Sequence, residues 1–345
     1  MTSADTAISI EEYKKEKRVE IEEKIEIIGE NDAFLKTIER AKKVANTNSN
    51  ILIVGESGTG KELIAQIIHT NSERKNKPFI PVNCAAIPGE LIESELFGHE
   101  KGSFTNAYKS RKGFLSQANK GTIFLDEIGE MSLSAQKKLL RVLEERRFYK
   151  IGGEQLIEVD VRIIAATNKN IAEEVRVNNF RRDLFYRINV VPILIPPLRH
   201  RKDDISKLVK YFIKKFNISL NKNIERIDPS ALEKLTLGKW LGNVRELKNL
   251  IECAVAISDE NTKTINEDML FKHKLDYHNQ DEDTLTTLNQ ILARAKKKAL
   301  IQATILCKTA TEAAEVLDIQ RTYLPRLVKE LFGCTFSELK KKYEY

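Results

Sequence analysis

A glycine-rich stretch before residue 62 has the residue types that bind phosphate. It fits the pattern GxxxxGK and consists of Gly55, Glu56, Ser57, Gly58, Thr59, Gly60 and Lys61. Glycines let backbone N–H groups turn inward around phosphate oxygens, and the lysine reaches the outer phosphates of a nucleotide. The next residue is Glu62, where the general pattern has a magnesium-binding Ser or Thr. The spacing predicts a nucleotide phosphate site.

Two adjacent carboxylates could perform hydrolysis beside that site. Asp126 and Glu127 end the apolar run that starts at Thr122. Asp126 would hold Mg²⁺, directly or through water, and Glu127 would polarise the attacking water. Two solvated acids at a strand end are the alternative, which a phosphate loop in the same chain disfavours. Together the two motifs predict hydrolysis of ATP with Mg²⁺ as a cofactor.

Other polar groups could reach the same phosphates. Thr167 and Asn168 follow another apolar run, and a polar pair there would lie beside the phosphates in a parallel sheet, although a plain turn would look the same. The basic and aromatic segment 180–187 contains Arg181 and Arg187. An arginine can stabilise charge on a transferring phosphoryl group, also from a neighbouring subunit. Spacing alone does not separate that role from a salt-bridged surface turn.

Short apolar strands alternate with amphipathic helices around these residues. The expected strands are 51–54, 79–82, 122–125, 161–166 and 190–195, with helices such as 62–69 and 134–145 between them. Continuous apolar strands between helices predict a parallel sheet covered on both faces. After Pro196 and Pro197 the pattern becomes helical. The expected helices there are 204–216, 230–237 and 244–257.

The chain divides by composition into five parts. Their expected bounds are 1–26, 27–198, 199–271, 272–284 and 285–345. The first is a Glu- and Lys-rich extension with no space for a sensory domain, the next two form an α/β unit and a helical subdomain, and the fourth is a polar linker. The last part has 11 Lys or Arg against 6 Asp or Glu, and a basic surplus of this kind favours nucleic acid as a partner.

Composition excludes membrane and secreted proteins. The 345 residues carry a formal net charge of +7, and no apolar run is long enough to cross a bilayer. The N-terminus has neither the apolar core nor the cleavage site of a signal peptide. The four cysteines form no CxxC pair, which indicates a reducing compartment and no zinc site. A cytoplasmic protein without membrane contact is predicted.

Together these motifs resemble the bacterial enhancer-binding proteins, the AAA+ activators of sigma-54 RNA polymerase. The resemblance runs from about residue 28 to residue 272, with the C-terminal segment added. GESGTGKE at 55–62 is similar to that family's phosphate loop, where the final Glu is usual, and GTIFLDEIGE at 121–130 is similar to its Walker B strand. The resemblance implies an AAA+ P-loop α/β/α sandwich with a helical lid subdomain, followed by an all-α helix-turn-helix domain.

The most specific stretch is ESELFGHEKGSFTNA at 93–107, which resembles the family's GAFTGA loop, the segment that grips the sigma factor. The loop here consists of Gly102, Ser103, Phe104, Thr105, Asn106 and Ala107. Phe104 and Thr105 match the family's sigma contact, whereas Ser103 replaces Ala and Asn106 replaces Gly. An asparagine reduces the backbone freedom of a loop that must move. The resemblance implies sigma-54 and its RNA polymerase as partners.

The resemblance also assigns residues to the nucleotide. Thr167 and Asn168 match sensor I at the end of a strand. Arg245, in GNVREL, matches sensor II, an arginine that reaches the nucleotide from the helical lid. Ile28 and Gly29, where the resemblance begins, are counted with the nucleotide-binding residues.

A ring of subunits is implied as well. Arg181 and Arg187 match the family's two arginine fingers, which act on the nucleotide of a neighbouring subunit. Asn83 matches the Asn that holds the catalytic Glu inactive until the substrate complex is sensed, and Gly152 with Gly153 matches the second pore loop. Sites shared between subunits imply self-association, usually as a hexamer. Changes at the hydrolysed phosphate are then relayed to the sigma-contacting loop.

The last part of the chain resembles a Fis-type helix-turn-helix. A short helix at 311–317 would precede a recognition helix within 320–331. The predicted contacts with enhancer double-stranded DNA are Gln320, Arg321, Thr322 and Arg326. Pro325 fits if Thr322 is the N-cap, because the missing N–H costs little at the third helical position. A helical oligomerisation tail is the alternative.

The favoured function is an ATPase that activates sigma-54 transcription from distant DNA sites. The main alternative is a DNA-binding AAA+ regulator of the same ancestry that no longer drives sigma-54 promoter opening. Phe104 and Thr105 argue against that alternative, and Asn106 leaves it open. A third possibility, an AAA+ motor without promoter work, is disfavoured by the sigma-contacting loop and the basic C-terminal part.

Overall fold

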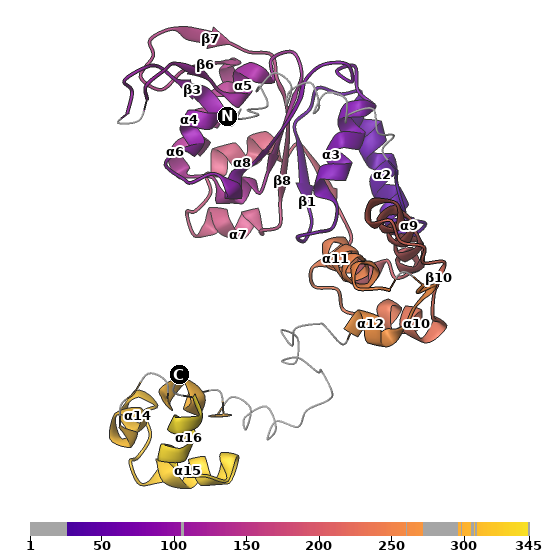
Figure 1. The fold of residues 1–345 in the computed structure, drawn as a ribbon. Coiled ribbons are helices and arrows are strands. Elements are labelled where there is room, and N and C mark those ends of the chain that lie inside the picture. The colour runs from indigo at the N-terminus through magenta and orange to yellow at the C-terminus, as the bar shows by residue number, and fades with distance from the viewer. Residues whose placement is uncertain are drawn as a thin grey trace, which may run out of the picture. The chain divides into compact units, whose positions relative to one another are not determined.

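The computed structural model describes residues 26–104, 107–259, 261–271, 296–297, 299–304, 307 and 309–343. The chain forms two compact units, Met1–His273 and Lys274–Tyr345, which are described separately below (Figure 1). Of the expected extension at 1–26, all but residue 26 lies outside the described residues, and so does the expected linker at 272–284. Among the residues described, no helix has the length and apolarity needed to cross a membrane.

A five-stranded parallel sheet forms the centre of the first unit. Its strands in spatial order are β2 (Phe79–Asn83), β5 (Thr122–Asp126), β8 (Arg162–Thr167), β1 (Ile51–Val54) and β9 (Val191–Leu194). All five predicted strands are confirmed, with shifts of one residue at some ends. Because every pair is parallel, the carboxyl ends of the strands share one edge of the sheet. That edge brings together the segments that follow β1, β5 and β8.

Helices cover both faces of this sheet (Figure 1). On one face, Ile51 and Ile53 pack with α2 (Asp32–Ala45) and α3 (Lys61–Thr70). On the other face, Leu52 packs in a cluster with α4 (Ile92–Phe97), α6 (Leu133–Glu145), α7 (Ile171–Arg176) and α8 (Arg182–Ile188). Full burial of one such aliphatic side chain stabilises the fold by about 1.5–3 kcal/mol. The central strands are continuously apolar because neither face meets water.

The helices α2 and α6 begin with a side-chain cap, whereas α3, which follows the glycine-rich loop, does not. Asn31 and Ser132 cap α2 and α6 through their side-chain oxygens, which accept the N–H groups of Ala33 and Ala135. The helix α3 begins at Lys61, and its N-cap Gly60 has φ 103° and offers no side-chain cap. The first N–H groups of α3 therefore remain available to an anion at the end of β1.

Two small antiparallel ribbons extend the first unit, and the sequence patterns did not indicate them. One pairs β3 (Gly98–His99) with β4 (Arg111–Lys112), just before α5 (Phe114–Gln117). The other pairs β6 (Arg147–Tyr149) with β7 (Leu156–Glu158). His99 also forms a bridge with Ile151, so the two ribbons contact each other. Strands this short carry too little periodicity to be recognised in a sequence.

A helical subdomain completes the first unit. It contains α9 (Asp203–Leu220), α10 (Pro229–Leu237), α11 (Asn243–Ala256) and α12 (Glu267–Phe271), with a short parallel pair of β10 (Arg226–Ile227) and β11 (Thr264–Ile265). The three helices predicted after Pro197 are confirmed, and α9 is longer than expected at both ends. Buried residues such as Phe212, Trp240 and Leu247 form its core.

The second unit is all-helical where it is described. Its helices include α14 (Ala310–Val316), α15 (Tyr323–Phe332) and α16 (Phe336–Tyr343), around a core with Leu324 and Val328. Thr322 is the N-cap of α15, so Pro325 occupies the third helical position, as predicted. Asp318 adopts φ 51° in the turn between α14 and α15, a conformation that glycine usually supplies.

Candidate active site

The loop between β1 and α3 has the geometry of a phosphate cradle. Gly58 and Gly60 have φ of 75° and 103°, in the region that favours glycine. Lys61 follows them and is 6% exposed. Its Nζ donates hydrogen bonds to the carbonyl of Gly55 and to Oε1 of Glu127, each at 3.1 Å. The loop therefore places one cation at the carboxyl edge of the sheet.

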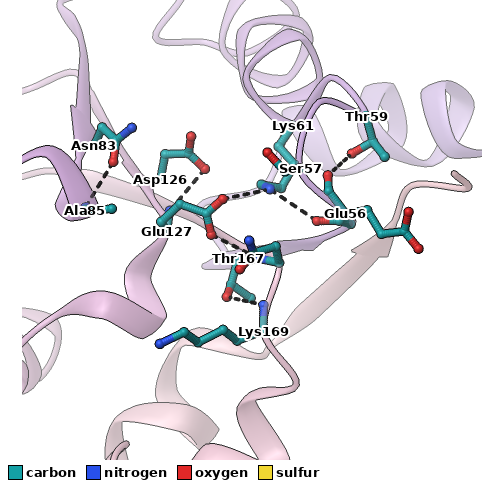
Figure 2. A network of polar contacts seen from close by, with 12 residues as sticks. Glu56, Ser57, Thr59, Lys61, Asn83, Ala85, Asp126, Glu127, Thr167 and Lys169 are labelled. Atoms are coloured by element: carbon teal, nitrogen blue, oxygen red, sulfur yellow. Dashed lines mark hydrogen bonds and ion pairs between the residues drawn. The ribbon is translucent and has the colours of Figure 1, made fainter. Parts of the chain in front are cut away.

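The two predicted carboxylates lie at this edge, at the end of β5. Figure 2 shows Lys61 and Glu127 pointing toward each other across the loop. Glu127 has φ 52°, and its second carboxylate oxygen accepts the backbone N–H of Asn168 at 3.1 Å. Oδ1 of Asp126 accepts the backbone N–H of Glu127 at 3.0 Å. Two segments that are distant from Glu127 in the sequence thus meet at its carboxylate, one at Lys61 and one at Asn168.

The charge balance at this edge suits a further cation. Burial raises the pKa of Asp126, Lys61 opposes that rise, and the neighbouring charge of Glu127 adds to it. Arg245 opposes the rise as well, and the hydrogen bond of Lys61 goes to Glu127 and not to Asp126. A partly buried carboxylate with incompletely neutralised charge is a chemically suitable ligand for Mg²⁺, which prefers oxygen donors. Asp126 fits the predicted role of magnesium ligand on these grounds.

Asn83 and Thr167 lie on the strands next to β5. Asn83 is in register with Asp126, and its Oδ1 accepts the N–H groups of Ala85 and Ala86 at 3.0 and 3.3 Å. These bonds are local, and no bond to Glu127 is among those the structure shows for Asn83. Thr167 is fully buried, and its Oγ1 accepts the N–H of Lys169 at 3.0 Å. The group of the sensor I segment that contacts Glu127 is the backbone of Asn168, whose side chain is exposed.

The helical subdomain also contacts the phosphate loop. Nη1 of Arg245 donates to Oγ of Ser57 at 3.0 Å, so the predicted sensor II arginine reaches the loop. The backbone N–H of Val244 donates to the carbonyl of Gly58 at 3.0 Å. A Cβ on Gly58 would lie 2.3 Å from the carbonyl oxygen of Gly242. The loop and the subdomain are therefore in direct backbone contact.

Three residues that sequence reasoning missed complete this contact. Arg199 and Asn243 bind Glu56, and the guanidinium of Arg201 donates to the carbonyl of Thr59 at 2.9 Å. They lie 142 or more positions after the loop residues that they contact, and their side chains look ordinary in the sequence. The one available signal was the run of basic residues after Pro197.

Ile28 and Gly29 lie where the first helical layer meets the subdomain. Ile28 packs against the subdomain core. A Cβ on Gly29 would be 2.8 Å from Phe34 and 3.0 Å from Oδ2 of Asp204, so a larger residue there would displace these side chains. Oδ1 of Asp204 accepts the N–H groups of the two residues after Gly29, Glu30 and Asn31. The structure thus ties this segment to α9, and its contact with a nucleotide stays a prediction.

The two predicted arginine fingers lie at the start and near the end of α8, and their side chains have different partners. Arg181 precedes the helix and forms a bidentate ion pair with Asp183, at 3.0 and 2.6 Å. Nη2 of Arg187 donates to the carbonyl of Leu143, in the last turn of α6, and its own carbonyl accepts from Asn50. Asn50 precedes β1, whereas the phosphate loop follows β1. Arg187 therefore lies at the opposite edge of the sheet, roughly 13 Å along the strand from the loop.

The predicted sigma-contacting loop lies between β3 and β4. The N–H of Gly102 donates to the carbonyl of Ala107 at 2.8 Å, and the N–H of Ala107 donates to the carbonyl of Phe104 at 3.0 Å. The ring of Phe104 meets His99 edge-on, with 5.0 Å between centroids, and is 36% exposed. Thr105 and Asn106 lie outside the described residues.

The predicted second pore loop touches this segment. Gly152 has φ 69°, and a Cβ there would be 2.6 Å from Cβ of Ser103. Nζ of Lys150 pairs with Oε1 of Glu100 at 2.7 Å. Oγ of Ser103 donates to the carbonyl of Glu100 at 2.8 Å. The predicted second pore loop and the predicted sigma-contacting loop therefore pack against each other.

In the second unit, the predicted DNA-contacting residues lie before and on α15. All four are exposed; three precede the helix and one lies on it, in the order Gln320, Arg321, Thr322 and Arg326. Arg321 forms an exposed ion pair with Glu315 at 2.6 Å. An exposed pair of this kind contributes little to stability and is easily exchanged for another anion.

Comparisons with known proteins agree with this geometry. Residues 27–194 match the family model of the sigma-54 interaction domain, and residues 199–287 match that of the AAA+ ATPase lid domain. The regulatory protein AtoC of Escherichia coli (strain K12) is 53% identical over 232 residues, which are 67% of this chain and 50% of AtoC. The Nif-specific regulatory protein of Klebsiella pneumoniae is 42% identical over 316 residues, which cover 87% of this chain and 60% of that protein.

A solved structure is similar as well. The crystal structure of NtrX from Brucella abortus in complex with ATP has a TM-score of 0.68 and 34% identity, and covers 93% of this chain and 73% of NtrX. The chain belongs to the family of sigma-54-dependent transcriptional regulators, with an AAA+ domain that consists of the parallel sheet and the helical lid. It spans about half the length of the first curated relatives it matches.

Proposed function

We propose that this chain hydrolyses ATP and uses the energy to convert the closed complex of sigma-54 RNA polymerase into an open complex. The observation that carries the proposal is the convergence of Lys61, Asn168 and Asp126 around Glu127 at the carboxyl edge of the sheet. The family model of the sigma-54 interaction domain supports the assignment of the partner. A partner of RNA polymerase would act in the cytoplasm.

The residues divide the chemistry among themselves. The inward-turning backbone of Gly58 and Gly60 would bind the phosphates, with Lys61 against the outer ones. Glu127 would accept hydrogen bonding from the attacking water and orient it in line with the bond that breaks. A magnesium ion held by Asp126 would neutralise phosphate charge. Arg245 would reach the same phosphates from the lid.

Transfer of force to the polymerase would run through the packed loops. Asn168 contacts Glu127 through its backbone N–H. A movement of Glu127 on loss of a phosphate would therefore shift the end of β8. The loop from Gly102 to Ala107 would bind the sigma factor through Phe104 and Thr105, with support from Gly152. This relay is the family's proposed coupling route, applied to the residues of this chain.

Ring formation and enhancer DNA binding belong to the same proposal. The position of Arg187 at the edge opposite its own phosphate loop supports a role for it at the site of a neighbouring subunit. A closed ring, such as a hexamer, would supply such a neighbour at every site. The exposed basic residues on and before α15 support insertion of that helix into a major groove of the enhancer.

The test is ATP-dependent promoter opening by sigma-54 RNA polymerase, measured together with ATP hydrolysis. Wild type is compared with Thr105→Ala and with Thr47→Ala, a control on an exposed threonine after α2. We expect wild type and the control to hydrolyse ATP and open the promoter, and Thr105→Ala to hydrolyse ATP without opening it. If wild type hydrolyses ATP and never opens the promoter, the alternative regulator without sigma-54 activity replaces this proposal.

A further inference from the structure

Asn243 is a buried polar residue that links three segments of the first unit. It is 0% exposed and adopts φ 52°, a conformation that costs free energy outside glycine. Its Oδ1 accepts the backbone N–H of Leu198 at 2.7 Å, in the connection between sheet and lid. Its Nδ2 donates to Oε2 of Glu56 at 3.1 Å and to the carbonyl of Ser57 at 3.0 Å. One amide therefore joins the connection, the lid and the phosphate loop.

Glu56 is the second centre of this network. Both of its carboxylate oxygens accept from the guanidinium of Arg199, at 2.6 and 2.7 Å, in a bidentate pair. Arg199 and then Asn243 lower the pKa of Glu56 to about 2, against the effect of burial. The carboxylate is thus held in its ionised form by an arginine and an amide. Bidentate pairs of this type fix orientation as well as distance.

The network forms hydrogen bonds with four successive residues of the phosphate loop. Glu56 is held by its side chain, Ser57 by its carbonyl and hydroxyl, Gly58 by its carbonyl and Thr59 by its carbonyl. Every donor in these contacts belongs to residues 199–245. The conformation of the cradle is therefore set partly by residues outside it, before any phosphate is bound.

We propose that Asn243 and Arg199 are positioning residues that hold the phosphate-binding loop in its binding conformation through Glu56, and so couple lid position to nucleotide affinity. This inference rests on the proposed ATPase function. Loss of the network loosens the cradle, which lowers affinity for nucleotide. The chemistry of the bound nucleotide changes little, because Glu127 and Lys61 keep their own contacts.

The sharpest variant is Asn243→Asp, which keeps the side-chain shape and reverses the hydrogen bonding at Nδ2. A carboxylate oxygen then faces the carboxylate of Glu56 and the carbonyl of Ser57. We expect the KM for ATP and the Kd for ADP by calorimetry to rise tenfold or more, which corresponds to about 1.4 kcal/mol, with a much smaller change in kcat. Adding Glu56→Gln supplies an amide donor in place of the repelling charge, so KM should fall again toward the wild-type value.

A double-mutant cycle keeps the inference testable if Asn243→Asp does not fold. Glu56→Ala and Arg199→Ala are each expected to raise KM and Kd about tenfold, and the double variant is expected to match the single ones. The control pair is Glu225→Ala and Lys263→Ala, an exposed ion pair of 3.0 Å within the lid. These controls are expected to leave both constants unchanged.

Two results would overturn the inference. One is an unchanged Kd for ADP in the folded Glu56 and Arg199 variants. The other is additive effects in the double variant, which would mean that the two residues act separately. ADP binding does not depend on turnover, so a wild-type protein that binds ADP without hydrolysing ATP would refute the proposed ATPase and still allow this test.

Discussion

Glu127 binds a different partner with each of its carboxylate oxygens, and this arrangement sets what single substitutions should do. One oxygen faces Lys61 and the other faces the backbone of Asn168. Both contacts hold the side chain beside the phosphate loop, between Lys61 and the backbone of Asn168. The carboxylate can then act on a water molecule without contributing to the grip on the phosphates themselves.

Replacement of Glu127 should therefore separate hydrolysis from binding. Glu127→Gln keeps the shape and loses the basic oxygen, so we expect kcat to fall by about 100-fold or more, while the affinity for ATP with Mg²⁺ stays close to that of wild type. Steady-state hydrolysis and calorimetric titration measure the two effects. A variant that keeps most of its kcat would show that another residue orients the water.

A pH dependence should mark the Glu56–Arg199 pair. Because the folded pKa of about 2 lies below the ordinary value of 4.5, the pair stabilises the fold fully above about pH 5 and loses that effect as pH falls toward 2. The Tm of wild type should exceed that of Glu56→Gln near neutral pH, and the difference should shrink on acidification. The side chain is 41% exposed, so the effect is modest.

The control for this pH series is Glu39→Gln, on an exposed glutamate of α2. Its Tm should follow wild type throughout. A gap between wild type and Glu56→Gln that stays constant or grows toward low pH would contradict the assignment.

Sequence patterns revealed the cradle and its acids but not what holds them. Lys61, Asp126 and Glu127 were recognisable because local motifs place them just after β1 or at the end of β5, and parallel strands bring those ends together. Asn243 and Arg199 act through contacts between distant segments, and no local pattern encodes such a contact. The local bonds of Asn83 were equally invisible, since they depend on the turn that follows β2.

Among the elements of the first unit, the two antiparallel ribbons are not predicted by the sequence patterns. The five sheet strands follow from continuous apolar runs, and the main helices follow from the helical spacing of apolar residues. The pairs β3–β4 and β6–β7 have two or three residues each, and their register comes from contact between loops. Ser103 and Gly152 meet where those loops touch, at a distance that leaves no space for a methyl group.

Gly152→Ala should therefore disturb coupling more than hydrolysis. Its Cβ would meet Ser103 at 2.6 Å, and the backbone has φ 69°. We expect near-normal ATP hydrolysis and promoter opening reduced several-fold. Gly89→Ala is the matched control, because a Cβ there meets nothing within 4 Å and its φ is not positive. Equal promoter opening by both variants would show that contact between the loops does not transmit the change.

At the scale of the whole molecule, the position of Arg187 predicts shared sites. A subunit that carries Glu127→Gln still offers a normal Arg187 to its neighbour, and a subunit that carries Arg187→Ala still has a normal Glu127. Each variant alone should hydrolyse ATP poorly, and a mixture should regain part of the wild-type rate. A mixture no more active than its components would mean that Arg187 does not serve a neighbouring site.

Hydrolysis at Glu127 is proposed to drive promoter opening, and permanganate reactivity of unpaired thymines measures that opening directly. Wild-type protein would be incubated with sigma-54 RNA polymerase and promoter DNA, with either ATP or a non-hydrolysable analogue. We expect reactive thymines with ATP, and none with the analogue or with Glu127→Gln. Thymines that become equally reactive with the analogue, or stay unreactive while ATP is hydrolysed, would contradict the proposal.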